Sequence, residues 1–576
     1  MLNRRIGVFI CHCGGNISDY VDVEEVRKSV ENSPGVVLSK KHMFTCSDAA
    51  QTEMMKDVLD EKLDGLVIAS CSPKLHLHTF RSMSERAGLN PYRYVQVNIR
   101  EQCSWAHTDN MRGATKKAIA LVEAGIAKSC LMPSLSTIRV ETVPKALIIG
   151  AGIAGLRSAL SLARLGIHAY LIEREEQPGG WVGNLGELFP QGKKGPSLID
   201  SLLEQVRREE GITLFTGTEL LEKSGNIGNF TVKLKTGQSD TISLNVGAII
   251  VTTGFDTYAP QKTEYGFNDT NVITLAEYER CLQEGTGEIQ YNGHTVKRVA
   301  YIYCVGSRQK TSESCPSPNT QCSRYCCTSA IHAAILTHKR DATVGQYHLY
   351  RDIRTYGKYE LLYDEALNLG SIFLRFDAAT PPTVHTDGQL RVNVHDTLTR
   401  GEEIEIDADL VVLVTGMVPR ENKKLVNILK LPIGKDGFFN EIHPKLRPVE
   451  TVIDGVFIAG TCQSPKTISE SVASALSAVS KTAGLLKRGY VELEPLVAMV
   501  DADRCVWCDE CTKACPYGAI QKVEHNGKEV AEIIPVLCKG EGACVPVCPK
   551  DALDVEGYTD HQITAMIDAF SKEMAK

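Results

Sequence analysis

The stretch Lys145-Ala-Leu-Ile-Ile-Gly-Ala-Gly-Ile-Ala-Gly155 indicates how this chain folds. An apolar run, as in a buried strand, leads into closely spaced glycines, and a helix rich in Ala and Leu follows them. Such a turn needs glycine where the chain bends, where backbone approaches a pyrophosphate, and where the helix packs on the strand. The pattern predicts a dinucleotide site at Gly150, Gly152 and Gly155.

Later segments favour FAD over NAD at this site. A second apolar run, 168–172, ends in Glu173, where an acid can bind the ribose hydroxyls of an adenosine. The runs 248–254 and 410–416 both end in Thr-Gly, and 456–460 precedes a predicted helix near Thr467. Together these segments resemble the thioredoxin reductase-like flavoproteins over some 340 residues. The residues expected to bind FAD are Gly150, Gly152, Gly155, Glu173, Arg174, Gly180, Thr253, Gly254, Gly460 and Thr467.

The chain departs from that fold where a second nucleotide should bind. The strand-like run 299–303 leads into Cys304-Val-Gly-Ser-Arg308, which lacks the second glycine fingerprint. The redox Cys-x-x-Cys of thioredoxin reductase is also missing. We therefore expect that the NAD(P)H site is lost, which disfavours a stand-alone NAD(P)H-dependent disulfide reductase.

Composition points to a cytoplasmic redox protein with several domains. The chain has 576 residues, a net charge of −7 and 20 cysteines. The mild charge does not indicate nucleic acid or an anionic membrane as partner, and no apolar run reaches membrane-spanning length. The apolar run near the start, 6–10, is too short for a signal peptide. In a reducing compartment, clumped cysteines indicate metal or redox chemistry instead of disulfides. The expected domains are a small parallel α/β domain at 1–135, an FAD domain at 144–490 after a linker, and a cysteine-dense domain at 498–576.

The clearest metal signal lies near the C-terminus. The spacing Cys505-x2-Cys508-x2-Cys511-x3-Cys515-Pro516 is that of a two-cluster bacterial ferredoxin, with zinc as the alternative. A second run repeats it except for a glutamate at the second position. In such a ferredoxin the fourth cysteine of each run binds the other cluster. This assigns one [4Fe-4S] cluster to Cys505, Cys508, Cys511 and Cys548, and the other to Cys538, Cys544 and Cys515 with Glu541 or an exogenous ligand.

Two further cysteine groups are candidate cluster sites. In the middle segment, a four-thiolate set stands where NAD(P)H would otherwise bind: Cys304, Cys322, Cys326 and Cys327. Cys315 is predicted to be a bystander. In the first segment, five cysteines each follow a strand-like run, so they can converge at one edge of a parallel sheet: Cys11, Cys13, Cys46, Cys71 and Cys103. The alternative for these five is that they are buried packing thiols.

Several of these motifs resemble the A subunit of heterodisulfide reductase. They are Cys11-His-Cys-Gly-Gly-Asn-Ile17, Ser70-Cys-Ser-Pro73, Asn98-Ile-Arg-Glu-Gln-Cys-Ser-Trp105, the Cys304 set and the terminal ferredoxin. The resemblance implies a cytoplasmic complex with B- and C-like subunits, a hydrogenase, formate dehydrogenase or NADH-oxidising module, ferredoxin as a partner, and a dimer. It also implies electron bifurcation at the flavin, toward ferredoxin and a disulfide-type acceptor.

Two departures from the family bear on this function. Longer members carry an extra ferredoxin module, but 180–254 contains no cysteine. Where methanogen members have a lysine thought to contact the flavin, this chain has His332, whose charge switches near pH 6.5; a structural helix histidine is the alternative. We expect an oxidoreductase with one FAD and three to four [4Fe-4S] clusters. The alternative function is a non-bifurcating relay in a quinone- or sulfate-reduction-linked complex, and a redox-sensing regulator is disfavoured because no signalling or DNA-binding module is evident.

Overall fold

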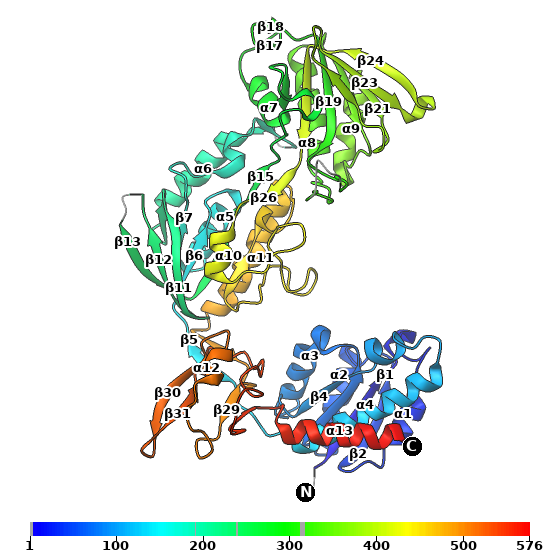
Figure 1. Ribbon diagram of the computed structural model, residues 1–576, viewed down its shortest axis with the longest axis vertical. Coiled ribbons are helices and arrows are strands. Elements are labelled where there is room, and N and C mark those ends of the chain that lie inside the picture. The colour runs from blue at the N-terminus through cyan, green and yellow to red at the C-terminus, as the bar shows by residue number, and fades with distance from the viewer. Residues whose placement is uncertain (1–3, 191, 238–239, 312–316, 576) are drawn as a thin grey trace. The chain divides into compact units, whose positions relative to one another are not determined.

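The computed structural model describes residues 4–190, 192–237, 240–311 and 317–575, so Cys315 lies outside the described residues. The chain forms two compact units: unit 1 is Met1–Val140 with Glu492–Lys576, and unit 2 is Glu141–Val491. The ends of the chain therefore fold together, and the middle folds by itself (Figure 1). None of the helices in the described ranges combines the length and hydropathy needed to cross a membrane.

The N-terminal part of unit 1 is the predicted parallel α/β domain. Its strands run in the order β2-β1-β3-β4, all parallel, with β1 and β3 buried at every residue. In a parallel sheet the carboxyl ends of the strands share one edge, so the loops after them meet there. The elements are β1 (Ile6–Cys11), α1 (Val23–Val30), β2 (Val36–His42), α2 (Asp48–Asp60), β3 (Gly65–Ser70), α3 (Pro73–Arg86), β4 (Tyr94–Asn98) and α4 (Met111–Leu131).

The C-terminal part of unit 1 has two short antiparallel sheets, β29 with β32 and β30 with β31. The last helix, α13, lies along α4 of the N-terminal domain, where Gln562 is 2% exposed and its Nε2 donates to the carbonyl of Leu131 at 3.1 Å. This packing joins the two ends of the chain into one unit. The elements are β29 (Ala498–Val500), α12 (Glu510–Ala514), β30 (Ile520–His525), β31 (Lys528–Ile533), β32 (Leu553–Val555) and α13 (Asp560–Ala575).

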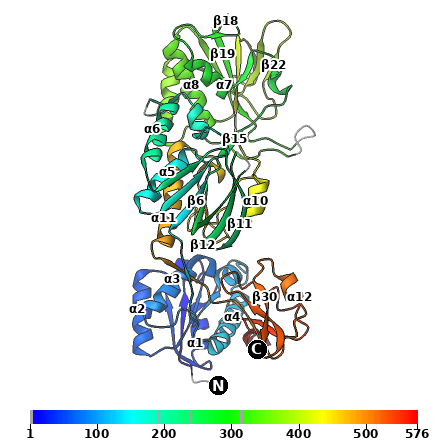
Figure 2. The ribbon, with the colours of Figure 1, turned by 90° about the vertical axis from the view of Figure 1, so that its left-hand side faces the viewer.

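Unit 2 contains two parallel five-stranded sheets, as the resemblance to two-dinucleotide flavoproteins predicts. The first, in the order β10-β7-β6-β14-β27, is covered by helices α5, α6 and α11 (Figure 2). Its strands begin with β6 (Lys145–Ile149), which runs into the glycine-rich turn and α5 (Ile153–Arg164). The others are β7 (His168–Ile172), β10 (Ile212–Phe215), β14 (Ala248–Val251) and β27 (Val456–Ile458), with helices α6 (Gly195–Arg208) and α11 (Ile468–Leu486).

The second sheet of unit 2 lies where the fold would bind a pyridine nucleotide. Its order is β16-β25-β19-β20-β21, and the two strands β15 (Phe255–Thr257) and β26 (Met417–Pro419) connect it with the first sheet. Its elements are β16 (Val272–Thr274), α7 (Leu275–Gln283), β19 (Arg298–Val305), α8 (Cys326–Arg340), β20 (Gly345–Tyr350), α9 (Glu360–Asn368), β21 (Ile372–Arg375) and β25 (Leu410–Thr415). Unit 2 also has two three-stranded antiparallel sheets. They are formed by β11 (Glu219–Asn226), β12 (Asn229–Lys235) and β13 (Thr241–Val246), and by β22 (Thr383–His385), β23 (Arg391–Asp396) and β24 (Glu402–Asp407). The predicted linker before unit 2 contains one short strand, β5 (Ile138–Glu141).

Candidate functional site

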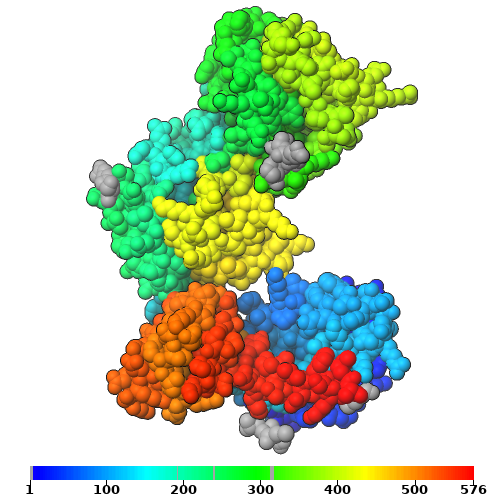
Figure 3. Space-filling view, viewed as in Figure 1, coloured from blue at the N-terminus to red at the C-terminus, as the bar shows by residue number. Residues whose placement is uncertain are grey.

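Unit 2 contains a cavity of about 1020 Å³ that begins at the glycine-rich turn and extends to α7 and α8 of the second sheet. In the space-filling view a recess opens between the cyan and yellow parts of the chain (Figure 3). The lining comes from the turn after β6, the ends of β7 and β14, the faces of α7 and α8, and the N-terminus of α11. We call this space the large cavity.

The three glycines of the turn each have a distinct role. Gly150 has a φ of +103°, and a Cβ there would lie 2.6 Å from the carbonyl oxygen of Thr252. A Cβ on Gly155 would lie 1.9 Å from the carbonyl oxygen of Gly150, so the helix can approach the turn only without a side chain. A Cβ on Gly152 would meet no atom within 4 Å, although Gly152 lines the large cavity. That open position fits a pyrophosphate against backbone.

Polar groups around the turn fit the rest of a dinucleotide. Glu173 lines the large cavity, and its carboxylate accepts hydrogen bonds from the backbone N–H groups of Ala151 (2.8 Å) and Glu175 (3.2 Å), which orients it. The Thr253 hydroxyl also faces this region, and it is buried with no hydrogen-bond partner in the described part of the chain. A buried orphan hydroxyl is costly, so a ligand that bonds to it would be favoured.

Most residues predicted to bind FAD line the large cavity, and two do not. Gly460 allows close packing, since a Cβ there would lie 3.0 Å from the Cβ of Ala154, and its neighbour Thr461 lines the cavity instead. Gly155 does not line the cavity; it allows α5 to pack closely on the glycine-rich turn. The predicted residues that line the cavity are Gly150, Gly152, Glu173, Arg174, Gly180, Thr253, Gly254, Thr467 and His332.

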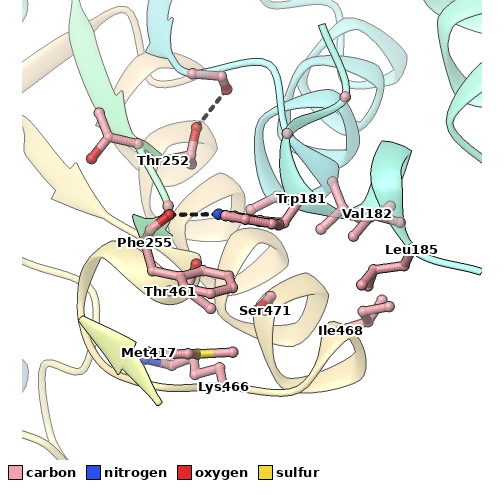
Figure 4. Close-up of a pocket in the computed structure, with 18 of the residues that line it drawn as sticks. Trp181, Val182, Leu185, Thr252, Phe255, Met417, Thr461, Lys466, Ile468 and Ser471 are labelled. Atoms are coloured by element: carbon pink, nitrogen blue, oxygen red, sulfur yellow. Dashed lines mark hydrogen bonds between the residues drawn. The ribbon is translucent and has the colours of Figure 1, made fainter. Parts of the chain in front are cut away.

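The N-terminus of α11 faces the large cavity beside a lysine that sequence reasoning missed. Thr467 caps the helix in a reciprocal box with Glu470. Lys466 lines the cavity, and burial lowers its pKa. Its Nζ donates to Gln463 Oε1 at 3.2 Å and to Ser464 Oγ at 2.8 Å. A helix N-terminus and an ammonium group together favour an anionic or electron-rich ligand there; Figure 4 shows Lys466 next to Met417.

Trp181 is a second missed residue of the lining. Its indole Nε1 donates to the carbonyl of Phe255 at 2.9 Å, and its ring stacks on the Phe255 ring at 5.7 Å between centroids (Figure 4). The lone signal in the sequence was its position directly after Gly179-Gly180. The indole is held in place by these contacts, so it supplies a rigid apolar wall.

Two titratable groups face the large cavity from the second sheet. Glu279, on α7, was not predicted, and burial raises the pKa of its carboxyl to about 7. His332, on α8, was predicted, and burial lowers the pKa of its imidazole. The His332 Nε2 lies 3.9 Å from Glu187 Oε1, and its ring lies 5.9 Å from the ring of Phe189. Burial thus favours the neutral form of both groups, a protonated carboxyl that can donate a proton and an unprotonated imidazole that can accept one.

The central thiol group consists of Cys304, Cys322, Cys326 and Cys327, and the structure brings these four together. The Cys326 thiol donates to Cys327 and thereby lowers the pKa of Cys327, while burial and neighbouring thiols raise the pKa of Cys304. Arg308 contacts Cys304, and its Nη1 is buried with no partner in the described ranges. An orphan guanidinium donor beside four thiols fits a negatively charged cluster.

The N-terminal thiol group consists of Cys11, Cys13, Cys46 and Cys71, at the carboxyl edge of the sheet. Burial, and then the neighbouring Cys11 and Cys13, raise the pKa of Cys46, and burial raises the pKa of Cys71 to about 11. Arg100 Nη1 donates to Cys13 Sγ at 3.5 Å, and Arg100 Nε is buried without a partner in the described residues. This donor is equivalent to Arg308 at the central thiol group and fits a cluster in the same way.

Cys103, the fifth candidate of the first segment, lies elsewhere. It is fully buried in the apolar core against α4 (Ala114, Ala118), and the charge that acts on its thiol is that of Lys117, not of a cysteine. The turn after β4 is a π-helix, Arg100–Ser104, which places Arg100 toward the other thiols and Cys103 into the core. Sequence position alone did not distinguish these two directions.

The terminal cysteines form two groups in the crossed arrangement that the spacing predicts. The first terminal group, which lines one small cavity, is Cys505, Cys508, Cys511 and Cys548. The second terminal group is Cys515, Cys538 and Cys544: after burial, the thiols of Cys538 and Cys515 raise the pKa of Cys544 most, and Cys511 of the first group does so less. Glu541 adjoins it. Among the described residues, no three His, Cys, Asp or Glu side chains converge on a position for a single metal ion.

Two family models match parts of this chain. Residues 498–555 match the 4Fe-4S dicluster domain family, and residues 144–306 match the pyridine nucleotide-disulphide oxidoreductase family. The chain is 36% identical to the A subunit of the H(2):CoB-CoM heterodisulfide,ferredoxin reductase of Methanothermobacter thermautotrophicus, over 100% of this chain and 99% of that protein. It is 35% identical to the second of the iron-sulfur A subunits of CoB–CoM heterodisulfide reductase of Methanopyrus kandleri, over 91% of this chain and 92% of that protein.

A third relative and one solved structure complete the comparison. The chain is 34% identical to the A subunit of the ferredoxin/F(420)H(2)-dependent CoB-CoM heterodisulfide reductase of Methanosarcina acetivorans, over 90% of this chain and 75% of that protein. The thioredoxin reductase of T. acidophilum is 17% identical, with a TM-score of 0.41 over 59% of this chain and 99% of that one.

Proposed function

This chain belongs to the family of iron-sulfur A subunits of heterodisulfide reductase, and we therefore propose that it distributes electrons between a flavin and four iron-sulfur clusters. The chain is an oxidoreductase with a flavin-binding domain and a 4Fe-4S domain. FAD would supply the conversion between two-electron and one-electron transfer, and it would lie in the large cavity.

One observation supports the transfer between flavin and cluster. Tyr325 and Thr328, which bracket Cys326 and Cys327 on α8, both line the large cavity. The cavity and the central thiol group therefore share one helix. An electron that leaves a flavin in the cavity would have this cluster as its first one-electron acceptor, in place of the NAD(P)H that the fold usually binds here.

The chain's own residues would orient the cofactor and manage protons. The turn at Gly150–Gly155 and Glu173 would fix the dinucleotide, and Lys466 with the α11 N-terminus would favour the added negative charge of reduction. Glu279 and His332 would exchange the accompanying protons. Trp181 would exclude water from one side.

The proposed cluster ligands follow from the four groups. The N-terminal thiol group and the central thiol group would each hold one [4Fe-4S] cluster, and the first terminal group a third. The second terminal group would hold the fourth with Glu541. The two parts of unit 1 would then be docking arms for partner subunits in the cytoplasm.

We further propose flavin-based bifurcation, because relatives named for both heterodisulfide and ferredoxin share the full length of this chain. The partners would be B- and C-like subunits, a module that supplies electron pairs, such as a hydrogenase, a formate dehydrogenase or an NADH-oxidising module, and ferredoxin. The alternative is a non-bifurcating relay, which the missing cysteines between 180 and 254 favour, since that stretch lacks an additional ferredoxin module.

The deciding experiment has two steps. Anaerobic purification followed by flavin, iron and sulfide analysis should give one FAD and about 16 iron atoms per chain; flavin without iron would refute the proposal. The complex should then reduce ferredoxin from the electron-pair donor only while a disulfide-type acceptor is present. Ferredoxin reduction that does not depend on the acceptor would establish the relay instead.

A further inference from the structure

The two terminal groups are built alike, which isolates their one chemical difference. The backbone N–H of Ala531 donates to Cys505 Sγ at 3.3 Å, and that of Ala498 donates to Cys538 Sγ at 3.3 Å. The fourth thiols repeat the match: the N–H of the residue four positions later donates to the sulfur at 3.3 Å for Cys548 and 3.4 Å for Cys515. The second terminal group therefore keeps the backbone hydrogen bonds of a ferredoxin cluster site, and it differs from the first at its second ligand position.

Two positions differ together between the two terminal groups. The second ligand position holds Cys508 in the first terminal group and Glu541 in the second, and the residue after the Cys-Pro that belongs to each group is Lys550 in the first and Tyr517 in the second. Cys508 and Lys550 line the cavity of the first terminal group. In the second terminal group, the Tyr517 hydroxyl donates a hydrogen bond to the Glu541 carboxylate. The substituted ligand thus has its own hydrogen-bond partner within reach of the site.

Glu541 is positioned to bind or release a ligand. Its side chain is exposed, and it stands between Gly540 and Gly542, both with positive φ (65° and 73°). A carboxylate is a harder donor than thiolate and is a weaker partner for iron in a sulfide cluster.

We propose that Glu541 binds an exchangeable iron at one corner of the second terminal cluster, and that the Tyr517 hydroxyl competes with this iron for the carboxylate. The inference rests on the proposed function, which places a cluster at Cys515, Cys538 and Cys544. The corner is a ferrous site of carboxylate and sulfide ligands. The first terminal cluster, with four thiolates, keeps all its iron.

Loss of the corner iron oxidises the cluster by one electron, so it requires a one-electron oxidant such as dioxygen or ferricyanide. The cluster [4Fe-4S]²⁺ gives [3Fe-4S]⁺, Fe²⁺ and one electron, and the oxidant takes up that electron. The bonds that break are those from the corner iron to its sulfides and to the Glu541 carboxylate. The carboxylate then accepts the Tyr517 hydrogen bond, and no proton is released. Supplying Fe²⁺ and one electron reverses the reaction.

The test uses the full chain, purified anaerobically with its flavin and clusters. Ferricyanide is added while a chelator reports released Fe²⁺ and electron paramagnetic resonance reports three-iron clusters. The wild type should release about one iron per chain, develop a three-iron signal, and recover on addition of Fe²⁺ with a reductant. Glu541→Cys should release none. Tyr517→Phe should release iron severalfold more slowly, because the competing donor is gone.

Cys508→Glu is the matched control, since it places a carboxylate in the first terminal group, which has Lys550 instead of tyrosine. It should add a second exchangeable iron. Circular dichroism and flavin content should be unchanged in every variant, because the flavin site is in unit 2.

Each failure has its own meaning. Equal iron release from Glu541→Cys and wild type would overturn the assignment of the corner, and wild-type kinetics in Tyr517→Phe would overturn the competition. If the wild-type chain contains FAD and about 16 iron atoms but releases no iron with ferricyanide, this inference is overturned and the proposed function stands. A chain with neither flavin nor iron would overturn the proposed function with it.

Discussion

A Cβ atom on Gly155 would lie 1.9 Å from the carbonyl oxygen of Gly150, far inside van der Waals contact. The oxygen belongs to the turn and cannot move as the end of a side chain can. The Thr252 Oγ1, which donates to the same carbonyl at 2.8 Å, would lie 2.9 Å from that Cβ as well. The start of α5 therefore packs on the turn only because residue 155 has no side chain.

Gly155→Ala should destabilise unit 2 and abolish flavin binding. The added methyl forces α5 away from a close-packed sheet, a strain of about 1–3 kcal/mol or more. Thermal unfolding of the apoprotein and the flavin content after purification measure the two effects. Gly152→Ala is the matched control, because its Cβ meets open space. It should keep the wild-type melting temperature and lower FAD affinity at least tenfold; equal destabilisation by both variants would contradict the assigned roles.

Cys46→Ala and Cys103→Ala should differ in iron content. Cys46 belongs to the N-terminal thiol group, so its loss should remove about four iron atoms per chain. Cys103 is a core residue, so its replacement should cost about 1 kcal/mol of stability and no iron. Iron analysis of the purified variants decides between them. Loss of a cluster from Cys103→Ala alone would show that the π-helix turns its thiol to the edge when iron binds.

Glu279→Gln should stabilise unit 2 at high pH and not at low pH. Burial raises the pKa of this carboxyl from 4.5 to about 7, so the folded state disfavours its charge. Above pH 4.5 the unfolded chain ionises first, and wild-type stability falls as the pH rises toward 7. Glu279→Gln has no carboxyl to ionise, so its stability does not fall in this pH range for that reason. The difference in urea midpoint should be near zero at pH 4.5 and correspond to up to about 2 kcal/mol at pH 8. A constant difference would show that Glu279 does not ionise in this range.

His332→Lys should make the flavin potential less dependent on pH. Burial lowers the pKa of His332, so the imidazole is neutral at pH 8 and gains its charge only as the pH falls. A cation near the flavin favours the reduced, more negative form. The variant should therefore have a higher midpoint potential than wild type at pH 8, and the gap should narrow only as the pH falls below 6.5. Spectroelectrochemical titration measures this, and His332→Gln, which gains no charge, should have a lower midpoint potential than wild type at acidic pH, where the wild-type imidazole is protonated. Identical curves for all three proteins would contradict a role for position 332 at the flavin.

Local patterns predicted the elements of this fold well. The apolar run 168–172 coincides with β7, the strand-like run 299–303 lies within β19, and the helix predicted near Thr467 is α11, which begins at Ile468. Buried parallel strands are continuous apolar runs, so their ends are visible in the sequence. The four-stranded order of the N-terminal sheet and the packing of α13 on α4 were not predicted, because they depend on contacts between distant segments.

The residues of the candidate site also fall into those with a local sequence pattern and those that only tertiary packing brings to the site. The glycine turn and the Cys-x2-Cys-x2-Cys run are local, so spacing alone defines which backbone bends and which thiols are neighbours. Glu279, Lys466 and Trp181 carry no such pattern; each lines the large cavity only because separate elements pack around it. The pKa shifts of Glu279 and Lys466 and the orientation of Trp181 result from burial, and burial depends on contacts that the sequence alone does not specify.

Residue type and short spacing were enough to establish the chemistry that this protein has available: a dinucleotide turn, four groups of thiols, and a glutamate where a cysteine would stand. Three relationships appeared only in the folded chain. Cys103 faces the core while Arg100 faces the thiols, Tyr517 reaches Glu541, and Cys326 shares a helix with the wall of the large cavity. Side-chain direction and burial depend on how distant elements pack, and such packing has no local signature in the sequence.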